Sequence, residues 1–314
     1  MPQILLRKIV ASLLLLSGLA GAATASASGF SNMYVFGDSL SDSGNVFALT
    51  GYPPEPYWNG RFSNGPTYAE NLAGMLGFTA APALLGGTNY AFGGATAGPG
   101  SAIGPFAFDL GSQVNAFRSV AGPADSDALY VVWAGANDLR TNPTPAGMLG
   151  ALSGVSGAIQ GLYAEGARNF LVMNLPNLGL TPEATHANVN DPATLGSALF
   201  DTFFGGVVGG LRSSLIGSNI RMLDTFGLLN NVVDNPQAYG LSNVTDNCIL
   251  AGAACNPNSY LFWDEVHPTA AGHRIIADAA YKVLAVPEPS TYALLFAGLG
   301  LISITVRRRG KHQA

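Results

Sequence analysis

The stretch Met33-Tyr34-Val35-Phe36-Gly37-Asp38-Ser39-Leu40 joins an apolar run directly to a Gly-Asp-Ser-Leu block. A short apolar run rich in branched and aromatic side chains is typical of a buried strand. Three further runs have the same character, at residues 128–134, 169–174 and 220–223. Residues that directly follow such a strand lie at the edge of an open sheet where ligands bind in α/β folds. The sequence therefore predicts that Ser39 lies at a ligand-binding edge.

Helical patterns alternate with these runs. They cover residues 67–76, 145–165, 192–215 and 268–284. Several begin at a turn or proline signal, as at Pro66-Thr67 and Pro268-Thr269. Alternating strands and helices predict βαβ units, and therefore a parallel sheet covered by helices on both faces. There is no internal repeat, and the glycine-rich patches are too short to be linkers, so we expect one α/β domain over residues 28–285.

Three more polar blocks follow the first one along the chain. They are Asn89-Tyr90-Ala91-Phe92-Gly93-Gly94, Gly135-Ala136-Asn137-Asp138 and Asp264-Glu265-Val266-His267-Pro268. Acyl transfer needs a nucleophile, a base, a group that orients the base, and donors for the oxyanion. Ser39, His267 and Asp264 have the chemistry for the first three roles. The Ser39 N–H, a glycine N–H near Gly94 and the Asn137 amide are the candidate oxyanion donors.

The four blocks resemble those of the GDSL or SGNH family of esterases and lipases. The Ser, Gly, Asn and His of that name fall on Ser39, on Gly93 or Gly94, on Asn137 and on His267. Residues 34–45 and 60–66 look like the longer lipase branch, and the resemblance covers roughly residues 33–284. It implies a three-layer α/β/α sandwich of flavodoxin-like type and a serine esterase that needs no cofactor or metal. The adjacent glycines leave the position of the backbone donor open.

Each block also has a purely structural interpretation. Asp38-Ser39 alone could be a helix N-cap, Asn137-Asp138 a turn, and His267-Pro268 a helix start. Their combination and order favour an active site. The elbow motif Gly-X-Ser-X-Gly is absent because Ser41 stands at its last position, which argues against an α/β-hydrolase. Two alternatives stay open: an acyltransferase with the same site, and a non-catalytic surface or matrix protein with the same fold.

Charge limits the partners. Between residues 28 and 286 there are 8 Lys and Arg against 18 Asp and Glu. A nucleic-acid partner would need a basic surface, so we expect none. The expected partner is an ester substrate: a lipid, a short acyl ester or an acylated glycan. The proline-rich segment 52–58 is a candidate lining of an acyl or sugar pocket, whereas we expect His186 to be solvated and His273 to be structural.

The two ends of the chain resemble targeting signals. Arg7-Lys8, an apolar stretch over 9–23 and Ala25-Ser26-Ala27 have the three parts of a secretory signal peptide, which would occupy residues 1–27. Residues 286–314 contain Pro287-Glu288-Pro289, an apolar segment and Arg307 to Arg309, and they resemble a PEP-CTERM sorting signal. This resemblance implies an exosortase-type membrane protease as partner. It also implies transient anchoring in the inner membrane and a final location outside, or on the surface of, a Gram-negative-type cell.

Cys248 and Cys255 enclose six residues shortly before the Asp264–His267 block. In an oxidising compartment such a pair is expected to form a local disulfide. A metal site would need further Cys or His ligands nearby, and the spacing offers none.

Overall fold

Four parallel strands form the central sheet in a computed structural model that describes residues 29–103 and 106–285. Their spatial order is β1 (Met33–Gly37), β4 (Leu129–Trp133), β5 (Asn169–Met173) and β6 (Asn219–Leu223). An isolated parallel bridge joins Val35 to Asn89 beside the outer edge of β1. The order is therefore that of a flavodoxin-like sheet in which the second strand is reduced to one bridge. The predicted signal peptide and sorting tail lie outside the described residues.

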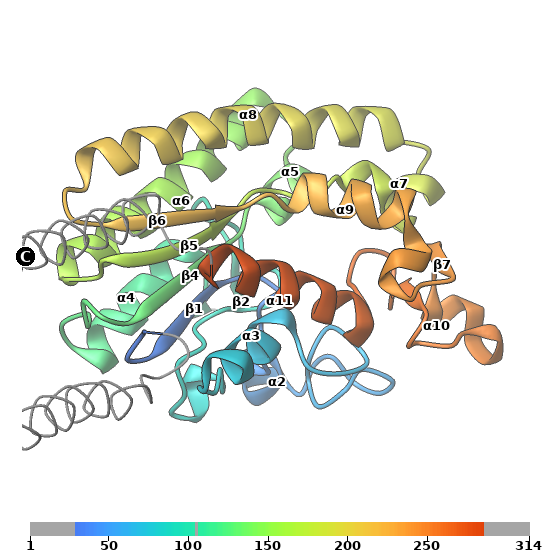
Figure 1. Ribbon diagram of the computed structural model, residues 1–314, viewed down its shortest axis with the longest axis horizontal. Coiled ribbons are helices and arrows are strands. Elements are labelled where there is room, and N and C mark those ends of the chain that lie inside the picture. Colours follow the sequence, from blue (N-terminus) through green and yellow to red (C-terminus); the bar gives the residue numbers. More distant parts are fainter. Residues whose placement is uncertain (1–28, 104–105, 286–314) are drawn as a thin grey trace, which may run out of the picture.

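Side chains alternate between the two faces of the sheet and fill two separate cores. On one face, Phe36 and Val132 pack with α4 (Leu110–Ala121), α6 (Pro145–Glu165) and α8 (Asn190–Ser214). On the other, Val35 and Val131 pack with α3 (Tyr68–Leu76) and α11 (Ala270–Ala285). Figure 1 shows α6 and α8 on one side of the strands and α3 and α11 on the other. The expected three-layer α/β/α arrangement with a parallel sheet is confirmed.

The long helices begin where the sequence provides caps. The Thr67 side chain accepts from the Glu70 N–H, and the Glu70 carboxylate accepts from the Thr67 N–H, which is a complete capping box for α3. Thr144 caps α6, and Pro145 occupies its first turn, where a missing N–H costs nothing. By length and composition α8 could also cross a membrane, but Phe200 and Phe204 on its inner face are fully buried against the sheet core.

The 12-residue helix α4 was not predicted, and neither were several shorter elements. The helices among them are α2 (Asn45–Thr50), α5 (Ala136–Thr141), α7 (Pro182–His186), α9 (Thr225–Asp234) and α10 (Cys248–Ala251). The short 3-10 helices are η1 (Ala83–Leu85), η2 (Leu178–Leu180), η3 (Pro236–Tyr239) and η4 (Gly252–Ala254). The additional strands are β2 (Ala102–Ile103), β3 (Phe106–Ala107), β7 (Asn243–Asn247) and β8 (Tyr260–Phe262). The pair β7 and β8 forms a small parallel sheet of its own, beyond the end of the central one.

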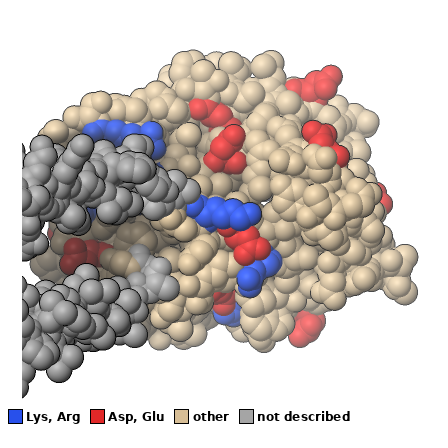
Figure 2. Space-filling model, in the orientation of Figure 1, with Lys and Arg blue, Asp and Glu red and all other residues tan. Residues whose placement is uncertain are grey.

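The described surface has few charges. On the face drawn in Figure 2, Lys, Arg, Asp and Glu are scattered among a large majority of uncharged residues. Two of the ion pairs, Arg61 with Glu70 and Arg118 with Glu165, join segments that pack together rather than forming a charged patch.

A disulfide joins Cys248 to Cys255, as expected from the sequence. It closes the segment that contains α10 and η4, directly before β8. Two residues next to Cys248 bond to the segment that follows β8. The Ile249 N–H donates to the Trp263 carbonyl, and the Asn247 amide donates to the Glu265 carboxylate at 2.6 Å. The disulfide therefore restrains the chain that supports residues 263–265.

We predict that replacing both cysteines, Cys248→Ser with Cys255→Ser, lowers the free energy of unfolding by about 2–3 kcal/mol, the chain-entropy value for so short a loop. Denaturant titration with and without reductant measures the loss. Reductant should destabilise the natural protein by the same amount and leave the double variant unchanged. Two free thiols in the exported protein, found by mass spectrometry, would disprove the bond.

Candidate active site

Ser39, His267 and Asp264 form a continuous chain of hydrogen bonds, although Ser39 and His267 are 228 residues apart in sequence. The His267 Nε2 lies 2.7 Å from the Ser39 Oγ, and the His267 Nδ1 lies 2.7 Å from the Asp264 Oδ2. Ser39 follows β1, whereas Asp264 and His267 follow β8 in the small second sheet. The loop that carries them therefore reaches the end of the central sheet from a separate unit of structure.

The turn around Asp264 is organised by its own carboxylate. Its Oδ1 accepts from the backbone N–H groups of Val266 and His267, at 2.9 and 2.7 Å. Burial raises the pKa of Asp264, but the hydrogen bond and charge of His267 outweigh that effect and hold the pKa at about 2. The carboxylate is therefore ionised at neutral pH and oriented toward the imidazole.

Tyr57 is a further member of this chain that sequence reasoning missed. Its hydroxyl donates to the Asp264 Oδ2 at 2.8 Å, the same oxygen that faces His267. Tyr57 belongs to the proline-rich segment 52–58, which is not part of the wall of the pocket at Ser39. Through Tyr57 the segment contacts the acidic residue, and its role as the lining of an acyl or sugar site stays a prediction. No local pattern could reveal this, because the two residues are 207 positions apart.

The backbone N–H groups of Ser39 and Gly94 have no hydrogen-bond acceptor among the described residues. The N–H of Gly93 is engaged, because it donates to the buried Asp42 Oδ2 at 2.9 Å. Gly94 is exposed and has a φ of 80°, a conformation that favours glycine. Of the two adjacent glycines, Gly94 is therefore the one whose N–H is free for a ligand.

The Asn137 side chain is held at both ends of its amide. Its Nδ2 donates to the Ala95 carbonyl at 2.9 Å, and its Oδ1 accepts from the Arg140 Nη1 at 3.2 Å. These partners fix which end is nitrogen and leave the second hydrogen of Nδ2 free. Arg140 is itself fixed by a two-point contact with Glu183, at 2.5 and 2.7 Å.

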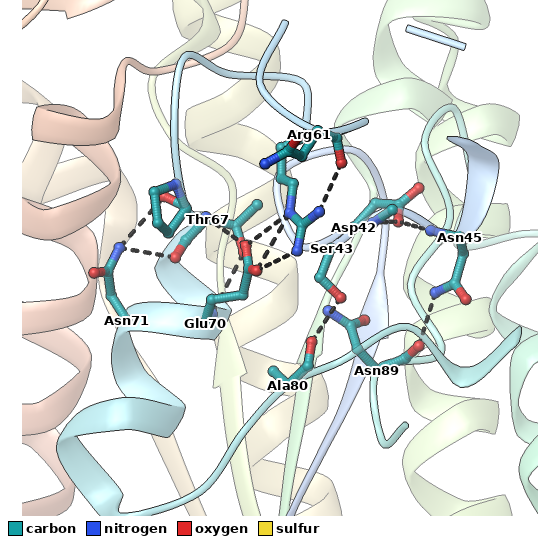
Figure 3. A network of polar contacts seen from close by, with 12 residues as sticks. Asp42, Ser43, Asn45, Arg61, Thr67, Glu70, Asn71, Ala80 and Asn89 are labelled. Carbon is teal, nitrogen blue, oxygen red and sulfur yellow. Dashed lines mark hydrogen bonds and ion pairs between the residues drawn. The ribbon is translucent and has the colours of Figure 1, made fainter. Parts of the chain in front are cut away.

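A buried polar network connects the serine loop, residues 38–45, to the glycine loop, residues 89–94. Figure 3 shows part of this network, including Asp42, Asn45 and Asn89. Asp42 accepts from the N–H groups of Gly44 and Asn45 at 2.7 and 2.6 Å, in addition to that of Gly93. The Asn45 amide donates to the carbonyls of Asn89 and Ala91, and the Asn89 amide donates to the Ser41 carbonyl. Figure 3 also shows Arg61 against Glu70, which ties the segment 60–66 to α3. The residues of the longer motifs at 34–45 and 60–66 thus hold the loops around the site in place through buried hydrogen bonds and an ion pair.

A pocket opens at this site, and Ser39, Asn137 and His267 are part of its wall. Asp38 also borders it, and burial raises the pKa of this carboxyl to about 6. Among the described residues no group of three or more His, Cys, Asp or Glu is placed to hold a metal ion.

The two other described histidines have separate positions. His273 is buried on α11, where its Nδ1 accepts from the Tyr68 N–H, and burial lowers its pKa to about 3. It remains neutral and structural, as expected. His186 is largely exposed, with 59% of its side chain accessible, and its Nδ1 lies 2.8 Å from Glu265. It is solvated as expected, but it also contacts the loop that carries His267.

Known proteins are similar to this chain over most of its length. The GDSL-like lipase/acylhydrolase family matches residues 33–280, and the PEP-CTERM protein-sorting motif matches residues 285–309. Esterase EstA of Pseudomonas aeruginosa is 32% identical, over 91% of this chain and 52% of EstA. A GDSL esterase/lipase of Arabidopsis thaliana is 29% identical, over 79% of this chain and 87% of the relative.

Two further comparisons concern an acyltransferase and a solved structure. Phosphatidylcholine-sterol acyltransferase of Aeromonas hydrophila is 26% identical, over 80% of this chain and 89% of that enzyme. The structure of Axe2, an acetylxylan esterase from Geobacillus stearothermophilus, is 18% identical with a TM-score of 0.46, and it covers 83% of this chain and 97% of Axe2. By the extent of the family match, the chain belongs to the GDSL-like lipase/acylhydrolase family, and it is a carboxylic ester hydrolase with a PEP-CTERM sorting motif.

Proposed function

We propose that the enzyme cleaves carboxylic esters through an acyl-enzyme on Ser39. His267 Nε2 takes the proton of the Ser39 hydroxyl as the oxygen attacks the ester carbonyl, and then gives it to the departing alcohol. Water repeats the sequence on the acyl-enzyme, so that the acid leaves and Ser39 regains its proton. The observation that carries the proposal is the unbroken hydrogen-bond chain from Ser39 through His267 to Asp264.

Asp264 and the oxyanion donors fill the remaining roles in this proposal. The ionised Asp264 orients the imidazole and offsets its positive charge after proton transfer. The negative oxygen of the tetrahedral intermediate would be met by the free N–H groups of Ser39 and Gly94 and by the free hydrogen of the Asn137 amide. Each such donor typically contributes on the order of 2.7–4 kcal/mol to the transition state.

Tyr57 acts as a positioning residue in this scheme. Its hydroxyl donates to the Asp264 Oδ2, so this oxygen has two hydrogen-bond partners, Tyr57 and His267. The hydrogen bond stabilises the carboxylate anion and limits its basicity. Tyr57 therefore helps to set both the orientation of the acidic residue and its influence on the imidazole.

Transfer to an acceptor alcohol would use the same acyl-enzyme. The relative named as an acyltransferase makes this a second candidate activity. Adding a primary alcohol to the reaction distinguishes the two: a transferase forms the new ester in preference to the free acid at low alcohol concentration, whereas a hydrolase does not.

The PEP-CTERM motif indicates export and sorting to the cell surface of a Gram-negative bacterium. We propose the finer division of the chain as a signal peptide over 1–27, a catalytic domain over 28–285 and a sorting tail over 286–314. An exosortase-type membrane protease would read the tail near Pro287 to Pro289. Fifteen apolar residues span about 22 Å as a helix, which is short of the roughly 30 Å hydrocarbon core and suits a transient anchor.

For the nucleophile, we predict that Ser39→Ala folds normally but loses at least ~1,000-fold in kcat. His267→Ala should be about as damaging, and the double variant scarcely worse, because the two residues act in one step. An organophosphonate probe should label Ser39, and Ser119→Ala on the exposed face of α4 is the control for labelling and activity. Peptide mapping that finds the label on another serine contradicts the mechanism.

For Tyr57, we predict that Tyr57→Phe shifts the acid limb of the kcat/KM profile to higher pH and lowers the plateau by roughly three- to tenfold. The shift follows because an Asp264 carboxylate without this donor stabilises the protonated imidazole more strongly. Tyr52→Phe, an exposed tyrosine in the same segment, is the matched control and should change neither quantity. A lower plateau with an unmoved profile would assign Tyr57 to structural support alone.

For the tail, we predict that deleting residues 286–314 leaves ester hydrolysis unchanged and alters where the protein is found. Cell fractionation with an activity assay measures both. The reason is that the sheet and its covering helices are complete at Ala285. Loss of the folded enzyme on deletion would show that the tail belongs to the fold.

A further inference from the structure

The pocket at Ser39 is bordered by residues of α9 and α11. α9 follows β6, whereas α11 covers one face of the sheet, and the two helices contact each other. Leu228, Leu229 and Val232 of α9 form one wall, and Ile275 and Ile276 of α11 form the opposite one. Leu228 and Val232 are one helical turn apart, so the apolar lining of this channel from α9 covers about 6 Å along that helix.

The polar atoms in the wall are already used by the protein. The hydroxyl of Thr225 and the indole N–H of Trp133 both donate to the Asn174 carbonyl, at 2.6 and 2.9 Å. The Thr181 hydroxyl donates to the Leu178 carbonyl at 2.7 Å. A sugar in this channel would have to give up its hydrogen bonds to water without new partners, which is costly. A hydrocarbon chain has no such cost.

The charged groups of the wall are confined to the catalytic end. Asp38 directly precedes Ser39, and Arg140 is three residues after Asn137 on α5. The channel is therefore polar where the ester bond would lie and apolar beyond it. This is the distribution required by a fatty acyl ester.

Gly94 is exposed and is not part of the wall of the channel. Phe62, whose ring contacts the His267 ring at a centroid distance of 5.2 Å, is not part of that wall either, but it is buried. During turnover the alcohol must leave while the acyl group stays bonded to Ser39. The exposed surface at Gly94 gives the alcohol a way out, and the apolar channel holds the group that remains.

We propose that the channel between α9 and α11 binds the acyl chain of the substrate, and that Leu229 and Ile275 set the acyl length. The enzyme then prefers longer straight acyl chains over acetyl groups, whichever alcohol they esterify. This inference rests on the proposed acyl-enzyme mechanism. It adds which end of the ester enters the channel and which side chains measure it.

Two isomeric esters test the orientation, because ethyl octanoate and octyl acetate have the same formula and carry the long chain on opposite sides of the carbonyl. Initial rates of acid release by the full-length enzyme are measured below the solubility limit of each ester. We expect ethyl octanoate to have a kcat/KM at least ~100-fold higher, given roughly fourfold per buried methylene. Equal rates, or faster cleavage of octyl acetate, would overturn the proposal.

Variants of the two walls test the residues. Leu229→Trp narrows the channel and should lower kcat/KM for ethyl octanoate at least ~10-fold while ethyl acetate stays within about twofold. Leu195→Trp, the same change at an exposed position of α8 outside the channel, should alter neither substrate. Ile275→Ala lengthens the channel and should move the optimum to a longer acyl chain.

The outcomes separate this inference from the mechanism on which it rests. If Ser39→Ala keeps its activity on both isomers, the acyl-enzyme proposal fails. If Ser39 is required but Leu229→Trp lowers both ethyl esters equally while phosphonate labelling of Ser39 stays normal, the channel proposal alone fails. Should Leu229→Trp not fold, Ile275→Ala decides: an unchanged chain-length profile counts against the channel, and a shifted one supports it.

Discussion

The buried carboxylate of Asp42 holds the two loops on which the site geometry depends. One oxygen accepts from the N–H groups of Gly44 and Asn45, and the other accepts from those of Val46 and Gly93. Burial raises the pKa of Asp42, and these four backbone donors lower it. A carboxylate enclosed in the protein would be costly without such donors. Asp42 can keep all four hydrogen bonds only if the serine loop and the glycine loop hold fixed positions relative to each other.

The relative position of the two loops determines which backbone atoms are free for a ligand. Because the N–H of Gly93 points to Asp42, the chain turns at Gly94 with a positive φ and leaves the next N–H exposed. From the sequence, the glycine proposed to donate to the oxyanion could be either Gly93 or Gly94, and no local pattern distinguished them. The choice depends on a hydrogen bond across 51 residues, which no local pattern encodes.

The sequence predicted the four strands of the central sheet and the helices α3, α6, α8 and α11, but it missed α4 and α9, which are longer than α3. The helix predicted over 145–165 has those limits in the structure, and each predicted strand coincides with an observed one to within two residues. The four polar blocks were found because each is local and chemically specific. The proposed acyl channel was not predicted, because its wall combines residues of α9, β8 and α11, and neither α9 nor β8 was predicted. Tyr57 was missed because its partner, Asp264, is 207 positions away in the sequence.

Ser39 and His267 are supported in different ways. Ser39 follows a central strand, whereas the Asp264–His267 loop lies off the sheet and is held by contacts from several segments. Tyr57 bonds to Asp264, the Glu183 N–H donates to the Glu265 carbonyl, and the Asn247 amide bonds to the Glu265 carboxylate. Asn247 is next to the disulfide, so an oxidised Cys248 restrains one of the supports of the base. Export to an oxidising compartment, which the sorting motif indicates, is therefore also what completes the scaffold of the active-site loop.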